Sequence, residues 1–285
     1  MRIASYAENG TVRPGIVVGD GIVPAPAGSM AELIAGGAAM LDRLRELEAR
    51  GTDARPLASV RLCAPIPRPT KNVFCVGRNY RLHIEEGARS RGVPPDYPKV
   101  PEFFTKPPTA VIGPGDAIRL PAITGKLDYE VELAMVVGRG GRDLGAADAL
   151  DHVFGFTVLN DVTARDLQRA HGQWFKGKGL DASCPTGPWI VTPDEFDLAA
   201  GHRLWLKVNG EIRQDSLVSD MVFDCTTILE HLSAGLTLDP GDIIATGTPS
   251  GVGLGMDPQV WLKDGDVVEA GVDGIGSITN TVRAA

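Results

Sequence analysis

The chain of 285 residues carries a formal net charge of −8, which argues against a surface for nucleic acids or anionic membranes. Hydrophobic residues make up 43% and charged residues 22% of the sequence, as is ordinary for a soluble globular protein. No apolar run reaches the length of a membrane span, and the N-terminus lacks the apolar core of a signal peptide. We therefore expect a cytoplasmic protein with neither a nucleic-acid nor a membrane partner.

Glycine and proline content indicates the fold class, and the cysteines indicate whether disulfides or a zinc site are expected. The 35 glycines and 21 prolines indicate many turns and favour a β-rich fold. The cysteines show no Cys-x-x-Cys spacing, so we expect reduced, buried thiols and no zinc site. They are Cys63, Cys75, Cys184 and Cys225.

The first part of the chain predicts a small N-terminal domain. Residues 2–24 contain short apolar runs separated by turns, and residues 30–50 carry apolar side chains at helical spacing, interrupted at Gly36 and Gly37. A proline cluster follows at 65–69, and such a cluster is typical of a joint between domains. We therefore predict a small domain over residues 1–68 and a main domain over residues 69–285.

The main domain begins with a short apolar strand at 73–76, after which Asn79 is a good N-cap for a helix over residues 80–88. On that helix His83 and Glu86 are three residues apart and can touch. The pair is either an incidental ion pair on a surface helix or a general base oriented by a carboxylate. Residues 87–98 are rich in glycine and proline, as expected of a mobile lid or of any exposed loop.

Three acidic residues lie in or just after the next two apolar stretches. Alternation over residues 127–133 predicts a half-buried strand, which places Glu130 and Glu132 on one face, about 7 Å apart along the strand. A second strand at 153–159 delivers Asp161 at its end. Carboxylates on adjacent strand ends form an all-oxygen site for a hard divalent cation. The alternative is a solvated strand face with both glutamates pointing to water.

Polar residues close to Asp161 extend this candidate site. The stretch after Asp161 predicts the start of a helix on which Arg165 and Gln168 share one face. Lys178 lies in a glycine-rich stretch at 173–188, where it is either solvated or a counter-charge for an anionic ligand. Asn209-Gly210 predicts a hairpin turn, and residues 225–234 have a helical pattern ended by a glycine.

Residues 243–253 superficially resemble a phosphate-binding loop, but the Gly-Lys-Ser/Thr ending is missing and no clear helix follows. We therefore reject a nucleotide site. Thr246, Thr248 and the neighbouring backbone N–H groups could still hold a carboxylate or an oxyanion. An ordinary glycine turn is the alternative.

Six segments occur together in the order typical of the fumarylacetoacetate hydrolase family. The chain resembles in particular the branch of acylpyruvate hydrolases, oxaloacetate decarboxylases and 2-oxo-diacid isomerases. The resemblance implies a mixed β-rich α+β fold, with a fumarylacetoacetase C-terminal-like β-roll, a small N-terminal α+β domain and a homodimer. The segments are residues 76–86, 104–107, 128–133, 160–168, 178–185 and 241–249.

The resemblance also implies roles for individual residues. It assigns a Mg²⁺ or Mn²⁺ ion to Glu130, Glu132 and Asp161, and catalysis to His83, Glu86 and Lys178. Substrate contacts are implied for Arg78, Tyr80, Lys106, Arg165, Gln168 and Thr248. The fumarylacetoacetate-specific enzymes have a further Asp ligand ahead of the catalytic His, whereas this chain has Gly-Arg-Asn-Tyr at 77–80. That difference argues against fumarylacetoacetate itself as the substrate.

The implied activity is a metal-dependent hydrolysis of a C–C bond in an acylpyruvate-type β-diketo acid, through a metal-chelated enolate. In that reaction His83, oriented by Glu86, activates water, while Lys178 offsets the developing negative charge. The alternative is an oxaloacetate-type decarboxylase or a 2-oxo-diacid isomerase or tautomerase at the same site, acting on a small 2-oxo acid. A metal-binding module without turnover is the less favoured third reading, because all the matched catalytic positions are present.

Overall fold

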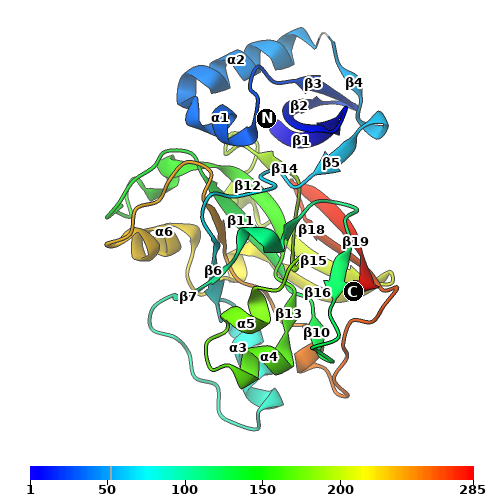
Figure 1. Ribbon diagram of the computed structural model, residues 1–285. Helices are drawn as coiled ribbons and strands as arrows, with labels where there is room; N and C mark the ends of the chain where they lie inside the picture. The colour runs from blue at the N-terminus through cyan, green and yellow to red at the C-terminus, as the bar shows by residue number, and fades with distance from the viewer. Residues whose placement is uncertain (52) are drawn as a thin grey trace.

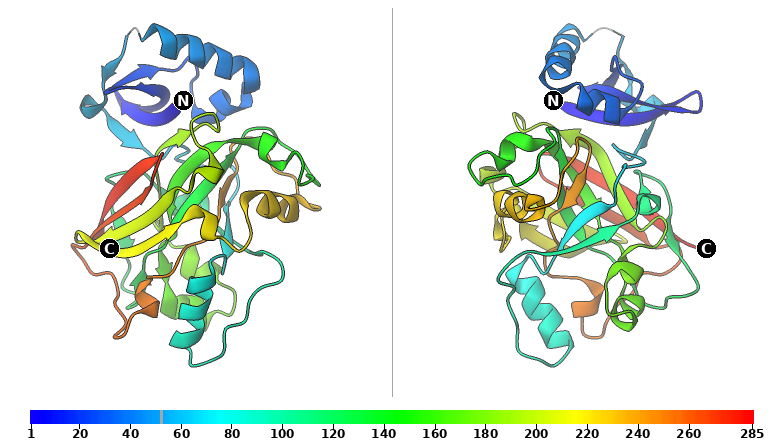
Figure 2. Two further views of the ribbon diagram at one scale, coloured as in Figure 1. Left: turned by 180° about the vertical axis from the view of Figure 1, so that it is seen from behind. Right: turned by 60° about the vertical axis from the view of Figure 1, so that its left-hand side comes forward.

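The computed structural model describes residues 1–51 and 53–285, and strands dominate its mixed α+β architecture (Figure 1). The N-terminal strands and two helices form one end of the molecule, and three short helices of the main body lie at the opposite end (Figures 1 and 2). No helix among the described residues is both long and apolar enough to cross a membrane.

The N-terminal end contains a meander of antiparallel strands with two helices beside it, as the sequence predicted. Gly36 ends the first helix and is the N-cap of the second, which confirms the predicted break. The elements are β1 (Arg2–Glu8), β2 (Thr11–Val18), β3 (Gly21–Pro24), α1 (Met30–Ala35), α2 (Gly37–Arg50), β4 (Arg55–Pro56) and β5 (Arg61–Cys63).

A 12-stranded sheet runs through the whole molecule. Its strand order is β4-β3-β2-β1-β14-β12-β11-β17-β6-β7, with β5 paired to β1 and β8 paired to β14. The central pairs β11–β12 and β12–β14 are antiparallel, whereas β17 and β6 are parallel. The added strands are β6 (Val73–Gly77), β7 (Glu102–Lys106), β8 (Val111–Ile112), β11 (Val131–Val137), β12 (Val153–Asn160), β14 (Cys184–Val191) and β17 (Ile243–Ala245).

A five-stranded sheet of order β16-β15-β18-β19-β9 packs against the central strands of the large sheet. The hairpin at Asn209-Gly210 joins β15 to β16, and both turn residues have positive φ, as a two-residue hairpin requires. These strands are β9 (Ile118–Leu120), β15 (Arg203–Val208), β16 (Glu211–Leu217), β18 (Val267–Val272) and β19 (Gly276–Ala284). A separate two-stranded ribbon pairs β10 (Leu127–Asp128) with β13 (Thr163–Ala164).

The remaining helices are α3 (Arg81–Ser90), α4 (Arg165–Ala170), α5 (Phe175–Lys178) and α6 (Cys225–Ser233). Of these, α3, α4 and α5 lie together at the end of the molecule remote from the N-terminal strands (Figure 1). Helix α6 begins at an Asp224 cap and confirms the helix predicted over 225–234. All four cysteines are free and buried, also as predicted.

The prediction of a half-buried strand over residues 127–133 is wrong. The strand is interrupted at Tyr129 and Glu130, and β11 is buried along its whole length. Leu133 and Met135 on one face join the core against the five-stranded sheet, and Ala134 on the other face joins a second core with the N-terminal helices. Alternating apolar and polar residues suggest a strand with one buried and one exposed face, but a strand covered on both faces is buried at every residue.

Two local predictions also need correction. Asn79 does not cap α3, because its side-chain amide instead donates to the carbonyl oxygens of Phe223 and Thr246 at 2.9 and 2.7 Å. Tyr80 takes the N-cap position without a side-chain cap. Lys178 lies at the end of the short helix α5 rather than in a loop.

The division at residue 68 stays a prediction, as does the homodimer. Across the division, Arg2 and Ile3 of β1 pair with Val191 and Ile190 of β14, so the large sheet is continuous. Side chains of α1 also share a hydrophobic core with residues of β6 and β11. The two predicted parts are therefore joined by both backbone pairing and packing.

Because β11 is covered on both faces, shortening a side chain in the middle of this strand leaves a cavity that the surrounding residues cannot fill. We expect Leu133→Ala, at a fully buried position, to lower the free energy of unfolding by about 2–5 kcal/mol. Leu82→Ala is the matched control, since Leu82 is 61% exposed and its loss should cost less than about 0.5 kcal/mol. Guanidinium unfolding followed by circular dichroism measures both, and equal costs would contradict the placement of β11.

Candidate metal centre and active-site cavity

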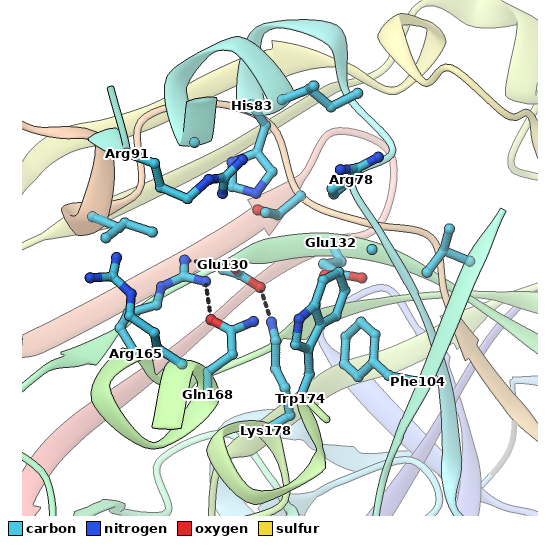
Figure 3. A pocket seen from close by; sticks show the side chains of 17 residues that line it. Arg78, His83, Arg91, Phe104, Glu130, Glu132, Arg165, Gln168, Trp174 and Lys178 are labelled. Atoms are coloured by element: carbon cyan, nitrogen blue, oxygen red, sulfur yellow. Dashed lines mark hydrogen bonds and ion pairs between the residues drawn. The ribbon is translucent and has the colours of Figure 1, made fainter. Parts of the chain in front are cut away.

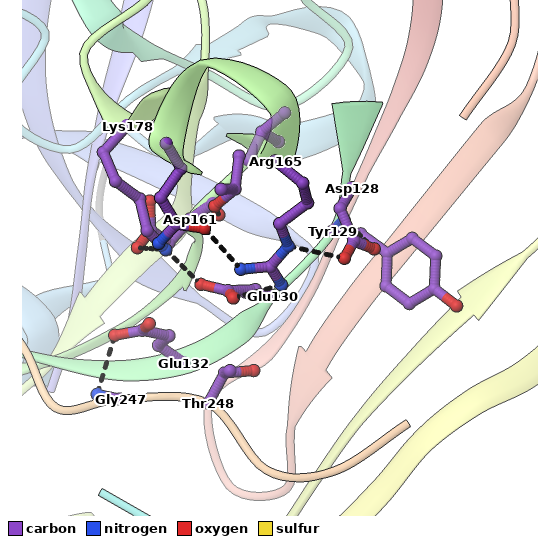
Figure 4. Close-up of polar contacts among 12 residues, drawn as sticks. Asp128, Tyr129, Glu130, Glu132, Asp161, Arg165, Lys178, Gly247 and Thr248 are labelled. Atoms are coloured by element: carbon purple, nitrogen blue, oxygen red, sulfur yellow. Dashed lines mark hydrogen bonds and ion pairs between the residues drawn. The ribbon is translucent and has the colours of Figure 1, made fainter. Parts of the chain in front are cut away.

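The strand register brings the three predicted carboxylates together. Val131 pairs with Asn160 in the β11–β12 ladder, and the Asp161 N–H donates to the Glu130 carbonyl at 2.8 Å. One carboxylate oxygen from each of Glu130, Glu132 and Asp161 lies within 4.8 Å of the others, and all three residues are buried (Figure 4). Glu130 and Asp161 are about thirty residues apart in the sequence, and the pairing of β11 with β12 brings them together.

Two lysines and an arginine contact this cluster. The Lys178 ammonium donates to Glu130 and to Asp161, the latter at 2.6 Å, and the Lys106 ammonium donates to the other Asp161 oxygen at 2.8 Å. Arg165 from the start of α4 donates to Glu130 at 2.5 Å (Figure 4). All three cationic groups are buried, so these ion pairs act in a medium that screens them weakly.

The neighbouring positive charges stabilise the ionised form of Glu130 much more than that of Glu132. Burial by itself favours a neutral Glu130, but the positive charges of Arg165 and Lys178 outweigh it and hold its pKa far below the usual range. Burial raises the pKa of Glu132 well above its usual range, and the charges of Asp161 and Glu130 add to that rise. Among the described residues, Glu132 accepts one hydrogen bond, from the Gly247 N–H at 2.7 Å, so a negative charge on it would be the least compensated of the three.

This donor set fits a hard divalent cation. Carboxylate oxygens are the ligands that Mg²⁺ and Mn²⁺ prefer, and crowded buried carboxylates are stable together only beside positive charge. The Lys178 ammonium, which bridges Glu130 and Asp161, shows that a cation is accommodated at this point. A divalent ion held by Glu130, Glu132 and Asp161 would supply the compensation that Glu132 lacks.

The glycine-rich loop after β17 binds a carboxylate, although the carboxylate belongs to the protein itself. Besides the Gly247 N–H bond to Glu132, the Thr246 and Thr248 hydroxyls donate to the carbonyls of Leu133 and Val131, both at 2.9 Å. These bonds fix the loop along β11 and orient Glu132. Thr248 also lines the cavity described below.

The predicted His83–Glu86 pair forms on α3, with 3.3 Å between His83 Nδ1 and Glu86 Oε2. Glu86 is in turn held by the same glycine-rich loop, because the Gly251 N–H donates to its Oε1 at 2.9 Å. A 3₁₀ turn at Gly253–Gly255 packs against Glu86 so closely that a Cβ on Gly255 would lie 2.0 Å from its carboxyl carbon. Glycine is therefore required at position 255 for this contact.

A cavity of about 230 Å³ opens between α3 and the helices α4 and α5 (Figure 3). Figure 3 shows His83 and Arg91 on one side of it and Lys178 and Gln168 on the other, with Glu130 between them. Eight predicted site residues line it: Arg78, His83, Glu130, Glu132, Arg165, Gln168, Lys178 and Thr248. His83 and the carboxylate cluster with Lys178, which are far apart in the sequence, therefore face the same cavity.

Four predicted site residues lie outside that lining. Asp161 is buried in the carboxylate cluster, where it accepts from Lys178, and Glu86 lies on α3 beside His83. Lys106 is fully buried, and it donates to the backbone carbonyls of Val162 and Lys178 as well as to Asp161. Tyr80 is also buried, and the substrate contacts predicted for these last two residues stay predictions.

Sequence reasoning missed Asp128. Its Oδ2 accepts from Arg165 Nε at 2.8 Å and its Oδ1 from the Gly253 N–H at 2.7 Å, so it connects α4 to the loop under α3. Its position two residues before Glu130, in the same alternating run, was a signal for a further carboxylate near the site. Phe104, Trp174, Arg91 and Arg169 also line the cavity without a signal of this kind.

Taken with this architecture, the sequence identifies the class of the protein. Residues 72–283 match the Fumarylacetoacetate (FAA) hydrolase C-terminal family. The chain belongs to this family and is an enzyme of the fumarylacetoacetate hydrolase superfamily.

Individual relatives show which members the chain is similar to. It is 44% identical over 265 residues to oxaloacetate tautomerase YisK of Bacillus subtilis, covering 90% of this chain and 86% of that one. A solved fumarylacetoacetate hydrolase from Exiguobacterium antarcticum superimposes with a TM-score of 0.86 at 42% identity, covering all of both chains. A 2-hydroxyhepta-2,4-diene-1,7-dioate isomerase from Mycobacterium marinum gives 0.78 at 36% identity, covering 100% and 98%.

The weak compensation available to a charge on Glu132 gives a test of metal binding. We expect Mn²⁺ to raise the melting temperature of the wild-type protein by mass action and to have little effect on Glu132→Gln. Without Mn²⁺ that variant should melt close to wild type, because the raised pKa keeps the Glu132 carboxyl neutral and glutamine replaces it with a neutral amide of similar size. Glu230→Gln, at an exposed carboxylate on α6, is the control that should respond like wild type. Scanning calorimetry measures all three, and a full Mn²⁺ response in Glu132→Gln would contradict the assignment.

The contact between Gly255 and Glu86 gives a second test. Gly255→Ala places a methyl group where the Glu86 carboxyl lies, so we expect the His83–Glu86 pair to be displaced and turnover to fall at least tenfold. Gly145→Ala is the control, because a Cβ at this exposed glycine would meet only an ordinary contact at 3.5 Å and the backbone there does not require glycine. Steady-state kinetics and calorimetry separate the effects, since a general loss of stability would lower the melting temperature as well.

Proposed function

We propose that this enzyme is a metal-dependent tautomerase of 2-oxo diacids, with oxaloacetate as the representative substrate. The observation that carries the proposal is the similarity to an oxaloacetate tautomerase over 90% of the chain, combined with the buried carboxylate cluster in the cavity. This proposal takes the alternative that the sequence left open and places it ahead of acylpyruvate hydrolysis. The similarity to a solved isomerase also favours tautomerisation over hydrolysis, because isomerisation likewise needs only proton transfer.

Tautomerisation of oxaloacetate moves one proton. In the direction from keto to enol form, a base removes a proton from C3 and the oxygen on C2 gains one, while no C–C bond breaks. Mg²⁺ or Mn²⁺, held by Glu130, Glu132 and Asp161, would supply Lewis-acid chemistry that polarises the 2-oxo group. The protein must then provide a base at C3 and positive charge near the oxygen that becomes negative.

His83 is the proposed base. Its Nδ1 faces Glu86, which leaves Nε2 as the ring nitrogen for proton transfer into the cavity. Glu86 is a positioning residue, because it holds the imidazole while being itself held by the Gly251 N–H. The pair can move a proton at C3 in either direction without activating a water molecule.

Lys178 is the proposed source of positive charge. Its ammonium lies at Glu130 and Asp161 on the cavity wall, and those carboxylates raise its pKa despite the cost of burial. It therefore stays cationic and offsets negative charge on the substrate oxygen. Arg165 and Gln168 lie three residues apart on α4, joined at 3.2 Å, and are positioned to orient the substrate carboxylate.

The test is a direct assay of proton transfer. With Mg²⁺ present, we expect the pure protein to accelerate the decay of enol absorbance of oxaloacetate, with much slower release of CO₂ and much slower cleavage of acetylpyruvate. EDTA should abolish the activity, and Mg²⁺ or Mn²⁺ should restore it. Faster acetylpyruvate cleavage than tautomerisation would restore the hydrolase to first place.

Variants separate the proposed roles. We expect His83→Ala to lower kcat by about 10²–10⁴-fold, the usual contribution of a general base, and Glu86→Gln to lower it less. Lys178→Met should lower kcat more than it raises KM, since its charge acts on the developing anion. His171→Ala is the control, because this exposed histidine does not line the cavity. Wild-type rates in His83→Ala would remove the dyad from the mechanism.

A further inference from the structure

The side-chain amide of Gln214 joins the five-stranded sheet to the strand that carries Glu132. Gln214 lies on β16 and is fully buried. Its amide oxygen accepts from the backbone N–H of Val131 at 2.9 Å, and Val131 is the residue between Glu130 and Glu132. The pairing of β17 with β11 covers residues 134–136, so Val131 lies beyond its end. A side chain therefore takes the place of a strand partner at this position.

Two backbone groups fix which way round this amide lies. The N–H of Val131 can only donate, so the amide oxygen of Gln214 must face it. The carbonyl of Pro249 can only accept, and the amide nitrogen of Gln214 donates to it at 2.9 Å. Neither group can reverse its role, so the orientation of the Gln214 amide is set at both ends.

The second hydrogen on the Gln214 nitrogen sets the direction of the Thr248 hydroxyl. This nitrogen donates to Thr248 Oγ1 at 2.8 Å, so the hydroxyl hydrogen cannot point back at Gln214. The hydroxyl instead donates to the Val131 carbonyl at 2.9 Å. Thr248 also lines the active-site cavity, so the same hydrogen is available to an acceptor bound there.

We propose that Gln214 is a positioning residue that commits the Thr248 hydroxyl to donating to a carboxylate oxygen of the bound substrate. The inference rests on the proposed function, in which a 2-oxo acid lies at the carboxylate cluster. A committed donor favours an oxygen that accepts, as in an ionised carboxylate, over a ligand group that presents a hydrogen of its own. Gln214 thus acts on the ligand through Thr248.

Gln214→Glu keeps the shape of the side chain and reverses this polarity. One carboxyl oxygen still accepts from Val131. If the new carboxyl is ionised, its other oxygen has no hydrogen to give and accepts from Thr248. If it is neutral, its single hydrogen goes to the Pro249 carbonyl, which has none of its own, and the oxygen again accepts from Thr248. In both states the Thr248 hydrogen turns away from the cavity.

Isothermal titration of the Mn²⁺-loaded protein with oxalate measures the consequence, because oxalate stands in for the carboxylate end of a 2-oxo acid. In the wild-type background we expect Thr248→Val to weaken oxalate about tenfold, as for a hydrogen bond to a charged group, and Thr248→Ser to retain the affinity. Gln214→Glu alone should weaken oxalate by a similar factor. In that background Thr248→Val should cost no more than about twofold.

Two results of this cycle would overturn the proposal. A tenfold cost of Thr248→Val in both backgrounds means that Gln214 does not act through Thr248. An unchanged oxalate affinity in Thr248→Val alone means that the hydroxyl does not donate to the ligand.

Asn280→Asp is the matched control for a buried carboxyl in place of an amide. Asn280 is 2% exposed, and its amide nitrogen donates to the backbone carbonyls of Gly113 and Asp116, both at 2.8 Å. We expect this variant to melt at a lower temperature, as Gln214→Glu does, but to bind oxalate like wild type. An equal loss of oxalate affinity in both variants would assign the effect to lowered stability and overturn the proposal.

Gln214→Met gives a second route if Gln214→Glu does not fold. Methionine has a similar size and makes no hydrogen bond to Thr248, so the hydroxyl is free to turn. Oxalate should bind several-fold more weakly, and the cost of Thr248→Val should fall below its wild-type value. An unchanged tenfold cost in this background also overturns the proposal.

Failure of this inference and failure of the proposed function give different results. Tautomerisation of oxaloacetate without coupling between Gln214 and Thr248 in oxalate binding overturns the inference alone. Coupling in a protein that does not tautomerise oxaloacetate supports the inference and overturns the tautomerase. A wild-type protein that binds no oxalate, with or without Mn²⁺, overturns the inference, because Thr248 then has no carboxylate to bind.

Discussion

Repulsion among Glu130, Glu132 and Asp161 is the constraint on which the rest of this site depends. Three buried carboxylates within 4.8 Å of one another are unfavourable unless cations face them from several directions. The lysines come from β7 and α5, and Arg165 comes from α4. The short helices at this end of the molecule therefore have an electrostatic reason to fold back onto the sheet, in addition to their modest apolar contacts.

The same arrangement explains how a tautomerase and a hydrolase can share one architecture. In the proposed function, the carboxylate cluster and Lys178 act on the 2-oxo acid end of a substrate, whatever happens farther along its chain. His83 stands on α3, across the cavity from Lys178 (Figure 3), so the bond that reacts depends on what the substrate presents to it. If these roles hold, the far wall of the cavity decides which reaction follows, while the carboxylate end stays the same.

Much of the fold and of the carboxylate cluster could be predicted, because the relevant signals are local. β12 follows its apolar run, the hairpin at Asn209-Gly210 follows its turn residues, and adjacent strand ends bring Glu130 close to Asp161. The burial of β11 on both faces could not be predicted, since it depends on the five-stranded sheet and the N-terminal helices covering opposite sides.

The unpredicted parts of the site are those that depend on contacts between distant segments. Asp128 matters because Gly253 and Arg165 reach it from separate loops. Asn79 looked like a helix cap, but its amide is used to join Phe223 and Thr246. The loop between Gly247 and Gly255 binds Glu132 at one end and Glu86 at the other. This loop is thus the physical connection through which the carboxylate cluster and α3 can influence each other, and any such coupling has the same free energy in both directions.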